Sequence, residues 1–445
     1  MAIVNSVFKS YDIRGAYPSE INEELAVAVA KAFAFFLQLD KVVVGRDART
    51  SSPALHKALT DTFIEMGVDV YDVGVTNTPL FNYALASQGF KGGIMITASH
   101  NPPEFNAFKL IKGGVQMSSP GEIDDVKKIA LESGAVQPLK PAKGKIISLD
   151  VLEEYVNEVT GHFADVKNLK VVVDYGNGMG SLSAKPVFAR LGLTIIPLYE
   201  EIDCTFPNHY ANPVEEENIE ELRKRVVSEK ADLGVAFDGD ADRAFVIDDT
   251  GAVIYPDFMM ALIAPHELEG RADKRVYYDL RSSKILAEVV KVNRGIGEMI
   301  RVGNPFLKQK LKYEGGVFAG ELSGHMMFQD HYCIDDGLYA TLKVMKVLAL
   351  SKKKLSELMK PLQKYYQTPE INTKVKDADE TLRKVAESFS DGEHVALDGV
   401  FVRYPDWWFS VRKSNTEPVV RLRLEADTKE KMEEMQDKLL KIINS

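Results

Sequence analysis

A short apolar run that ends in polar or glycine-rich residues recurs along the chain, and this repetition constrains the fold most. The runs are KVVVGRD (41–47), GGIMITASH (92–100), NLKVVVDYGNGMG (168–180), ADLGVAFDGDADR (231–243) and KRVYYDL (274–280). Each has the length of a buried strand, and the apolar run that follows Asn22, EELAVAVAKAFAFFL, has the length of a buried helix. The pattern predicts several α/β units with parallel or mixed sheets, and functional loops beyond the carboxyl ends of their strands.

The C-terminal part has a different pattern. Three strand-like runs, GVFVRYP, WWFSVRK and PVVRLRLEA, precede a helix whose apolar positions recur at helical spacing, namely Met432, Met435, Leu439, Ile442 and Ile443. Polar or Pro/Gly-rich stretches that suit domain boundaries are QPLKPAKGK (137–145), DDTGA (248–252) and YYQTPEINT (365–373). At 445 residues the chain is long enough for several domains.

Composition and charge narrow the class of protein. A net charge of −10 argues against nonspecific binding to nucleic acid or to an anionic membrane surface. No apolar run approaches the length of a membrane span, and the first residues do not form a signal peptide. Two cysteines, without metal-ligand spacing, favour a reducing cytoplasm. We therefore expect a cytoplasmic protein whose anionic substrate, if it has one, is met by locally concentrated positive groups.

The stretch ITASHNPPEFNAFK (96–109) places a serine, Ser99, at the end of a predicted strand and stiffens the backbone behind it with Pro102 and Pro103. Such a hydroxyl is a candidate nucleophile held in position. A serine–histidine hydrolase is the alternative. We expect the side chains of the sequence neighbours Ser99 and His100 to diverge, and no GxSxG elbow is present, so the hydrolase interpretation is weak.

The stretch DGDADR contains Asp238, Asp240 and Asp242 at a spacing of two. These carboxylates face one point only if the backbone curls into a loop, and there they would form a cage for a hard cation. The alternatives are a solvated acidic turn and an EF-hand. The EF-hand fails because positions six and twelve are Arg243 and Asp249 and because strands, not helices, flank the loop. Arg243 beside the cage suits a phosphate that shares the metal.

Two further polar stretches suit ligand recognition. RKSNTEP (412–418), between two strands, offers many hydrogen-bond donors and would grip a phosphate dianion, although a polar hairpin turn would look alike. GELSGH (320–325) alternates Glu321, Ser323 and His325, so the three side chains can face one ligand and suit sugar hydroxyls. A simple polar turn is the alternative there as well.

Together these four stretches resemble the α-D-phosphohexomutases, especially the phosphomannomutase/phosphoglucomutase branch. TASHNP resembles the phosphoserine loop of that family, DGDADR the metal loop, GELSGH the sugar-recognition loop and RKSNTEP the phosphate-binding loop, in the family's order. SYDIRG, GRDART, FPNHYANP and RVGNPFLKQKL fit as well. The resemblance implies four domains around a central cleft, three similar α/β domains with mixed sheets and a smaller helix-on-sheet domain. We expect them at 1–147, 148–249, 250–366 and 367–445.

The resemblance also implies a mechanism. Ser99 would carry a phosphoryl group and, with Asp238, Asp240 and Asp242, would hold Mg²⁺. Transfer to a hexose monophosphate would give a hexose 1,6-bisphosphate, which also serves as activator, and would interconvert hexose 1-phosphate and hexose 6-phosphate. Lys109 and Arg243 are the other catalytic candidates; Lys109 would move the hydroxyl proton, with a lowered pKa, or would only attract phosphate. The substrate-binding candidates are Tyr11, Arg14, His100, Arg281, Asn304, Glu321, Ser323, His325, Arg412, Ser414, Asn415, Thr416 and Arg421.

Some positions depart from the family pattern. Asn304 stands where the branch often has histidine, and Arg281 replaces a lysine. Leu322 argues against the glucosamine branch and therefore favours mannose and glucose phosphates as substrates. The alternatives are a phosphoglucosamine mutase, a phosphoserine-dependent sugar phosphatase and a non-catalytic sugar-phosphate binding protein. Small-molecule sugar phosphates are the expected partners, and the protein is expected to be a monomer or a homodimer.

Overall fold

A computed structural model describes residues 4–413 and 419–444. The chain divides into two compact units, and each is discontinuous in sequence. Unit 1 comprises residues 1–255 and 323–356, and unit 2 comprises residues 256–322 and 357–445. Among the described residues, no helix combines the length and the apolar character needed to cross a membrane.

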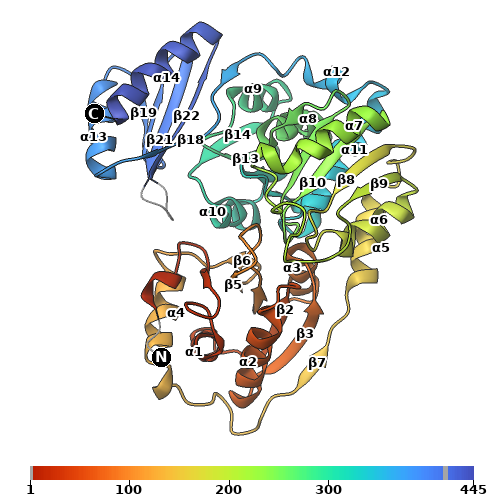
Figure 1. The fold of residues 1–445 in the computed structure, drawn as a ribbon, viewed down its shortest axis with the longest axis vertical. Helices are drawn as coiled ribbons and strands as arrows, with labels where there is room; N and C mark the ends of the chain where they lie inside the picture. The colour runs from red at the N-terminus through yellow and green to blue at the C-terminus, as the bar shows by residue number, and fades with distance from the viewer. Residues whose placement is uncertain (1–3, 414–418, 445) are drawn as a thin grey trace. The chain divides into compact units, whose positions relative to one another are not determined.

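The first sheet of unit 1 is mixed and has the strand order β1-β5-β4-β2-β3-β7, with β6 paired to β5 (Figure 1). Its strands are β1 (Ile13–Ala16), β2 (Lys41–Arg46), β3 (Asp69–Val75), β4 (Gly92–Ile96), β5 (Phe105–Lys112), β6 (Val115–Gln116) and β7 (Ile146–Ser148). The helices of this part are α1 (Glu23–Leu37), α2 (Ser52–Glu65), α3 (Thr78–Ser87) and α4 (Glu122–Leu131).

Helices cover both faces of this sheet, which explains why its central strands are continuously apolar. Val42 and Val44 of β2 pack in one cluster with α1, α2 and α4, whereas Val43 packs with Phe81 of α3 on the other face. The predicted helix after Asn22 is confirmed: the Asn22 side chain caps α1 by accepting a hydrogen bond from Leu25 N at 3.0 Å. The carboxyl ends of β2 and β4 therefore open into the loops that carry Asp47 and Ser99.

The second sheet of unit 1 has the order β12-β11-β10-β8-β9. Its strands are β8 (Lys170–Asp174), β9 (Thr194–Leu198), β10 (Leu233–Phe237), β11 (Ala244–Asp248) and β12 (Val253–Ile254), and its helices are α5 (Leu152–His162), α6 (Ser181–Leu191) and α7 (Glu220–Glu229). The segment 323–356 adds β16 (Met326–Phe328) and α11 (Gly337–Ser351) to the same unit. β10 and β11 form an antiparallel hairpin whose connection is the DGDADR loop.

Unit 2 contains a parallel set of strands in the order β14-β13-β15, namely β13 (Arg275–Asp279), β14 (Ile296–Ile300) and β15 (Phe318–Gly320). Its helices there are α8 (Pro256–Leu268), α9 (Lys284–Val292) and α10 (Asn304–Gln309), and α12 (Leu355–Met359) follows α11 in sequence.

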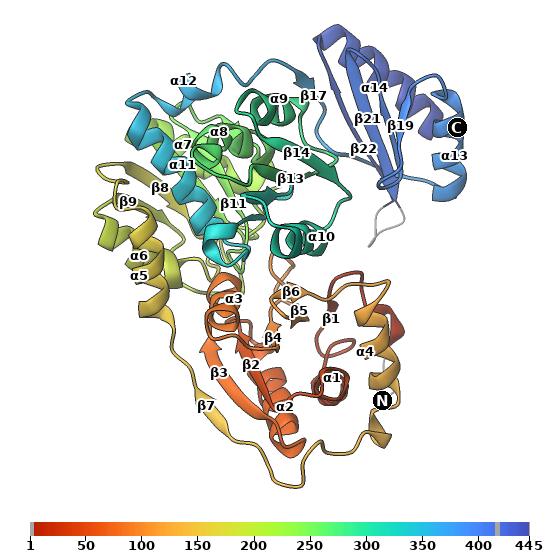
Figure 2. The same ribbon diagram turned by 180° about the vertical axis from the view of Figure 1, so that it is seen from behind.

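The C-terminal part of unit 2 is a sheet in the order β17-β22-β21-β20-β19, with β18 paired to β22 and with α13 and α14 on one face (Figure 2). The bounds are β17 (Tyr366–Gln367), β18 (Ile371–Lys374), β19 (Glu393–Val395), β20 (Val400–Arg403), β21 (Trp407–Lys413), β22 (Val419–Ala426), α13 (Ala378–Ser388) and α14 (Lys429–Ile443). The predicted strands and closing helix are confirmed. In α14, Met435, Leu439 and Ile443 are buried, as the apolar spacing predicts.

Candidate active site

Ser99 lies in the loop after β4, where its backbone has a left-handed conformation with φ of +53°. A non-glycine residue there costs on the order of 1–2 kcal/mol, so the surroundings have to impose the conformation. The side chain is 5% exposed, and Ser99 N donates to Thr97 Oγ1 at 3.1 Å. The hydroxyl is thus presented by a strained loop that its neighbours hold.

Arg49 holds that loop. Its guanidinium donates to four backbone carbonyl oxygens, those of Ser99, Asn101, Pro102 and Phe105, at distances of 2.9, 2.7, 2.6 and 3.0 Å. Arg49 is 1% exposed, and Asp47 anchors it through a contact of 3.2 Å from Nε to Oδ2. The two prolines alone were expected to stiffen this loop; the Arg49 clamp was not predicted, although the GRDART stretch was the available signal.

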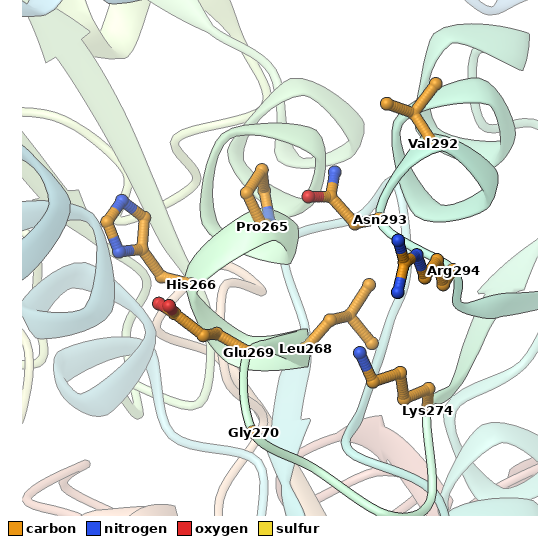
Figure 3. A pocket seen from close by; sticks show the side chains of 9 residues that line it. All are labelled: Pro265, His266, Leu268, Glu269, Gly270, Lys274, Val292, Asn293 and Arg294. Carbon is orange, nitrogen blue, oxygen red and sulfur yellow. The ribbon is translucent and has the colours of Figure 1, made fainter.

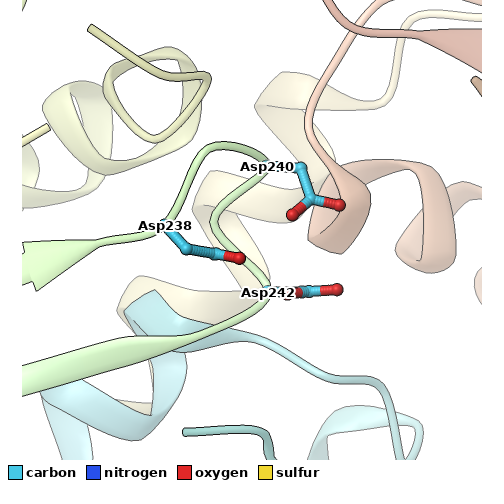
Figure 4. A group of neighbouring side chains, drawn as sticks. All are labelled: Asp238, Asp240 and Asp242. Carbon is cyan, nitrogen blue, oxygen red and sulfur yellow. The ribbon is translucent and has the colours of Figure 1, made fainter. Parts of the chain in front are cut away.

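The three aspartates of the DGDADR loop converge from one turn between β10 and β11 (Figure 4). One ligand oxygen from each of Asp238, Asp240 and Asp242 lies within 4.8 Å of the others, and all three residues are buried. Among the described residues, Asp240 Oδ1 is buried and has no hydrogen-bond partner, and the buried Asp242 Oδ1 has a long contact of 3.5 Å with His325 Nε2. A buried oxygen-only donor set with unsatisfied acceptors fits a hard divalent cation.

Ser99 and Arg243 complete the centre of this site. Ser99 Oγ donates to Asp238 Oδ2 at 2.7 Å, and Arg243 Nη2 donates to Ser99 Oγ at 3.2 Å. The pKa of the Asp238 carboxyl is raised to about 7. Burial is the largest cause, the charge of Arg243 opposes it, and the charge of Asp242 adds to the increase. Crowded carboxylates of this kind are stabilised by additional positive charge.

Lys109 supplies part of that charge from β5. Its Nζ lies 2.6 Å from Asp240 Oδ2 and 2.8 Å from Asp242 Oδ2. Burial alone would lower the pKa of the Lys109 ammonium, but the two carboxylates outweigh burial and raise the pKa above its ordinary value. The decrease in pKa that we expected from the sequence is therefore wrong for this arrangement, because the nearest charges are negative.

His100 corrects a second expectation. Its Nδ1 lies 3.2 Å from Ser99 Oγ, so the two neighbouring side chains do not diverge. However, burial and the charges of Arg243 and Arg14 lower the pKa of His100 well below its usual range. The imidazole is then neutral, and its Nδ1 accepts a hydrogen bond from Arg243 Nη2 at 2.5 Å. That nitrogen is occupied, which removes the geometric basis of a serine–histidine hydrolase.

Thr78, at the start of α3, is a site residue that the sequence analysis missed. Its Oγ1 donates to Asp240 Oδ2 at 2.5 Å, and its N–H donates to Asp240 O at 3.1 Å. The amino end of α3 therefore faces one carboxylate of the cluster, where the helix dipole favours negative charge. No local pattern in the sequence links these residues, because they are 162 positions apart.

Segment 323–356 returns to the same loop. His325 pairs with Arg243 in an antiparallel bridge, and its Nε2 lies 3.5 Å from Asp242 Oδ1. Ser323 Oγ lies 3.1 Å from His325 Nδ1. Gly337, at the start of α11, donates from its N–H to the carbonyl of Ala241 at 3.2 Å, and a Cβ there would meet the Arg243 backbone at 2.7 Å.

Two N-terminal candidates lie near the serine loop or its sheet. Arg14 Nη1 donates to Ala98 O at 3.1 Å and to Asn101 Oδ1, and its other donors bind Asp12. The carbonyl of Tyr11 accepts a hydrogen bond from Gln116 at 2.6 Å.

Within unit 2, four of the predicted residues gather around a residue that was not predicted, Glu370. Three arginines, Arg281, Arg412 and Arg421, contact its carboxylate at 3.1–3.2 Å. Arg281 also contacts Glu321 at 3.3 Å. Burial opposes ionisation, but the three arginines lower the pKa of Glu370 to about 2.

Four other predicted residues belong to the same unit. Asn304 is the first residue of α10. Ser414, Asn415 and Thr416 lie outside the described residues.

Comparisons with known proteins identify the family of the chain. Four domain models described as phosphoglucomutase/phosphomannomutase match the chain: alpha/beta/alpha domain I at residues 5–134, domain II at 153–251, domain III at 255–366 and the C-terminal domain at 370–442. The predicted domain boundaries stay predictions, because the matched stretches leave the residues between them unassigned.

Individual proteins match over nearly the whole chain. A phosphomannomutase/phosphoglucomutase of Pseudomonas aeruginosa is 35% identical over 440 residues, which cover 96% of this chain and 93% of that protein. A crystal structure of a phosphoglucomutase/phosphomannomutase family protein from Burkholderia thailandensis gives a TM-score of 0.91 at 35% identity, covering 99% of this chain and 98% of the other. An Aspergillus fumigatus N-acetylphosphoglucosamine mutase, solved with GlcNAc-6P and magnesium, shares the fold at 15% identity, with a TM-score of 0.58 over 82% of this chain and 92% of that one.

Fold and relatives together define an isomerase of the phosphotransferase type, built from three alpha/beta/alpha domains and a C-terminal domain. The chain belongs to the phosphoglucomutase/phosphomannomutase family.

Proposed function

We propose that this protein interconverts hexose 1-phosphate and hexose 6-phosphate, of mannose or glucose, with Ser99 as the phosphoryl carrier. The observation that carries the proposal is the position of Ser99 Oγ, 2.7 Å from Asp238 Oδ2 and 3.2 Å from Arg243 Nη2. A phosphoryl group on this oxygen would have a cation-binding carboxylate cluster on one side and a guanidinium on the other. Phosphoryl transfer depends on such positioning and charge neutralisation more than on a strong base.

The carboxylate cluster suits Mg²⁺, which prefers oxygen ligands. Asp238, Asp240 and Asp242, with an oxygen carried by Ser99, would hold the ion, and the ion when bound would neutralise the charge of the transferring group. Lys109 and Arg243 add fixed positive charge next to the same carboxylates. Because two carboxylates stabilise the Lys109 ammonium, we assign Lys109 a charge-neutralising role in place of that of a general base.

The reaction sequence follows from one serine serving two positions of the sugar. The bond between phosphorus and the Ser99 oxygen breaks while a free sugar hydroxyl forms a new bond to phosphorus, and the proton that this hydroxyl gives up is balanced by the proton that the freed Ser99 oxygen takes up. The product is a hexose 1,6-bisphosphate. The same compound acts as activator, because it can transfer a phosphoryl group to a Ser99 that has lost its own. Return of the other phosphoryl group to Ser99 releases the isomeric monophosphate. A phosphatase would instead give the phosphoryl group to water.

Unit 2 supplies the groups that we propose for recognition of the sugar phosphate. Arg281, Arg412 and Arg421 offer guanidinium groups for the phosphate that is not reacting. Glu321 would accept hydrogen bonds from sugar hydroxyls. The other candidates for binding, proposed from the family resemblance, are Tyr11, Arg14, His100, Asn304, Ser323, His325, Ser414, Asn415 and Thr416.

A variant of Ser99 tests the carrier. Intact-mass analysis of the wild-type protein after incubation with glucose 1,6-bisphosphate should show a form that is one phosphoryl group heavier, with the added mass on the peptide that contains Ser99. Ser99→Ala should lose both this form and mutase turnover, whereas Ser228→Ala, on an exposed position of α7, should keep both. Full turnover by Ser99→Ala would refute the mechanism, and release of inorganic phosphate without isomerisation would identify a phosphatase.

A second test concerns reorientation of the bisphosphate. If one distal site holds the phosphate that is not reacting, Arg412→Ala should weaken the binding of 1-phosphate and 6-phosphate hexoses by similar factors. Losing a hydrogen bond to a charged group costs about 1.5–3 kcal/mol, or about 10- to 150-fold in affinity. Direct binding of each monophosphate measures this, and an effect on one isomer alone would contradict a shared distal site.

A further inference from the structure

A cavity of about 550 Å³ in unit 1 is lined by an unusual number of lysines. They are Lys167, Lys230, Lys352, Lys353 and Lys354. The cavity lies where α7 and α11 end, because Lys230 directly follows α7 and Lys352 directly follows α11. None of these residues belongs to the proposed hexose phosphate site.

Most of these ammonium groups are not neutralised by the protein. Lys354 lies 3.5 Å from Asp249. The other four lysines have no side-chain hydrogen bond or ion pair with any residue in the described ranges 4–413 and 419–444. Asp232 also lines the cavity, but its carboxylate accepts a hydrogen bond from Lys170 N at 2.7 Å.

The charge of the cavity can be estimated from its lining. The lining contains five lysines, all exposed, and two aspartates, and two helices end there with carbonyl groups, each end equivalent to about half a negative charge. The aspartates and the helix ends together neutralise about three of the five positive charges, and about two positive charges remain. This excess occurs in a chain whose net charge is −10.

A second cavity, in unit 2, shows that such an excess is not a general property of helix ends. The cavity of Figure 3, of about 450 Å³, also lies at two helix ends, those of α8 and α9. Its lining contains two cations, Lys274 and Arg294, and one anion, Glu269, with His266 counted as neutral. The two helix ends add about one negative charge. The charges there cancel to about zero.

The lysine-lined cavity also has an apolar lining. Leu348 and Leu355 are 5% and 0% exposed, whereas Val227 is 51% exposed and offers an uncovered apolar surface. An excess of about two positive charges matches a phosphate monoester, whose charge at neutral pH lies between about −1.5 and −2. The apolar lining suits the organic group of such an ester.

We propose that this cavity binds the phosphate group of an organic phosphate monoester, at a site separate from the one that transfers phosphoryl groups. β10 begins beside the cavity, after Asp232, and ends at the DGDADR loop, and β11 returns from that loop to Asp249. Five residues of extended chain separate the two ends by about 16 Å. The two sites thus lie at opposite ends of one hairpin.

Adenosine monophosphate is a suitable probe, because it is a phosphate monoester but not a hexose phosphate. With the full chain, hydrogen exchange should show protection by the nucleotide at 227–232 and 348–355, and isothermal titration should give its dissociation constant. Adenosine should bind at least tenfold more weakly, and so should inorganic phosphate. Lys352→Gln/Lys353→Gln should weaken nucleotide binding at least tenfold, while Lys127→Gln/Lys128→Gln, which removes the same charge from α4, should leave it unchanged.

The outcomes separate the parts of the proposal. Absence of protection at both segments with millimolar nucleotide, or equal binding by the pocket variant, would overturn the site. Equal binding of adenosine would overturn the role of the lysines. Equal binding of inorganic phosphate would overturn the role of the organic group. Both double variants should keep wild-type mutase turnover and melting temperature, which shows that a loss of binding does not come from unfolding.

Discussion

Replacement of Arg49 by lysine tests whether the guanidinium clamp, and not the two prolines alone, holds the serine loop. Lysine keeps the positive charge and a similar length. It has three donors on one nitrogen, however, whereas the Arg49 side chain makes five hydrogen bonds, four to loop carbonyls and one to Asp47. Because one of the three ammonium donors stays on Asp47, two donors remain for four carbonyls, and at least two loop carbonyls lose their partner in Arg49→Lys.

The magnitude follows from burial. Arg49 is 1% exposed, so water cannot easily replace it as donor to the carbonyl oxygens that lose their partners. A hydrogen bond to a charged donor contributes about 1.5–3 kcal/mol, so the loop should lose about 3–6 kcal/mol of the free energy that holds it closed. At about 1.4 kcal/mol per tenfold change, opening becomes at least about 100-fold more frequent.

Two measurements check this estimate. Amide exchange of Ser99, Asn101 and Phe105 should accelerate at least about 100-fold in Arg49→Lys, and mutase turnover should fall with it. Arg190→Lys is the control, because Arg190 makes its side-chain contacts at the surface, with 40% of the side chain exposed. Exchange and turnover within twofold of wild type in Arg49→Lys would refute the clamp.

Three further outcomes are expected. Asp240→Asn should weaken Mg²⁺ binding in titration calorimetry and lower turnover in parallel; turnover that survives EDTA in the wild type would contradict a metal requirement. Glu370→Gln should lower the melting temperature without ligand, since three arginines lose their counter-ion, yet strengthen sugar-phosphate binding; weaker binding would contradict this. Burial opposes the charge of His331, but Asp336 and Glu158 outweigh it and raise the pKa of His331 to about 9. The protonated imidazole therefore stabilises the folded protein fully below about pH 6.5, and this stabilisation is lost as pH rises through about 9. Denaturant titrations should show up to about 3 kcal/mol less stability across that range, and His331→Gln should remove that dependence; an unchanged slope would count against it.

Local sequence patterns predicted the strands and the loops that follow them. KVVVGRD and WWFSVRK correspond to β2 and β21, because continuous apolar character marks a strand that is covered on both faces. The DGDADR carboxylates converge as expected, since a spacing of two brings them to one side only in a tight turn. In each of these cases the determining interactions lie within a few residues.

The contacts that were missed are long-range. Thr78 meets Asp240, and Glu370 gathers arginines from segments up to 89 positions away. Such pairs leave no periodicity or spacing in the sequence. The error about Lys109 has a related cause, because the sign of its pKa change depends on whether carboxylates or cations are nearest, and the fold sets that order.

The return of segment 323–356 to the DGDADR loop has a consequence for biosynthesis. Ser99 and Asp238 are 139 positions apart, and Gly337, which packs on the Arg243 backbone, is made later still. A nascent chain that has emerged as far as Tyr255 carries the serine and all three aspartates but not the residues that close over their loop. The segment 256–322 must also leave the ribosome before α11 can form. The proposed loading of Ser99 with phosphate is therefore expected to follow synthesis of most of the chain, and a protein truncated at Tyr255 should have the proposed reacting residues without a finished site.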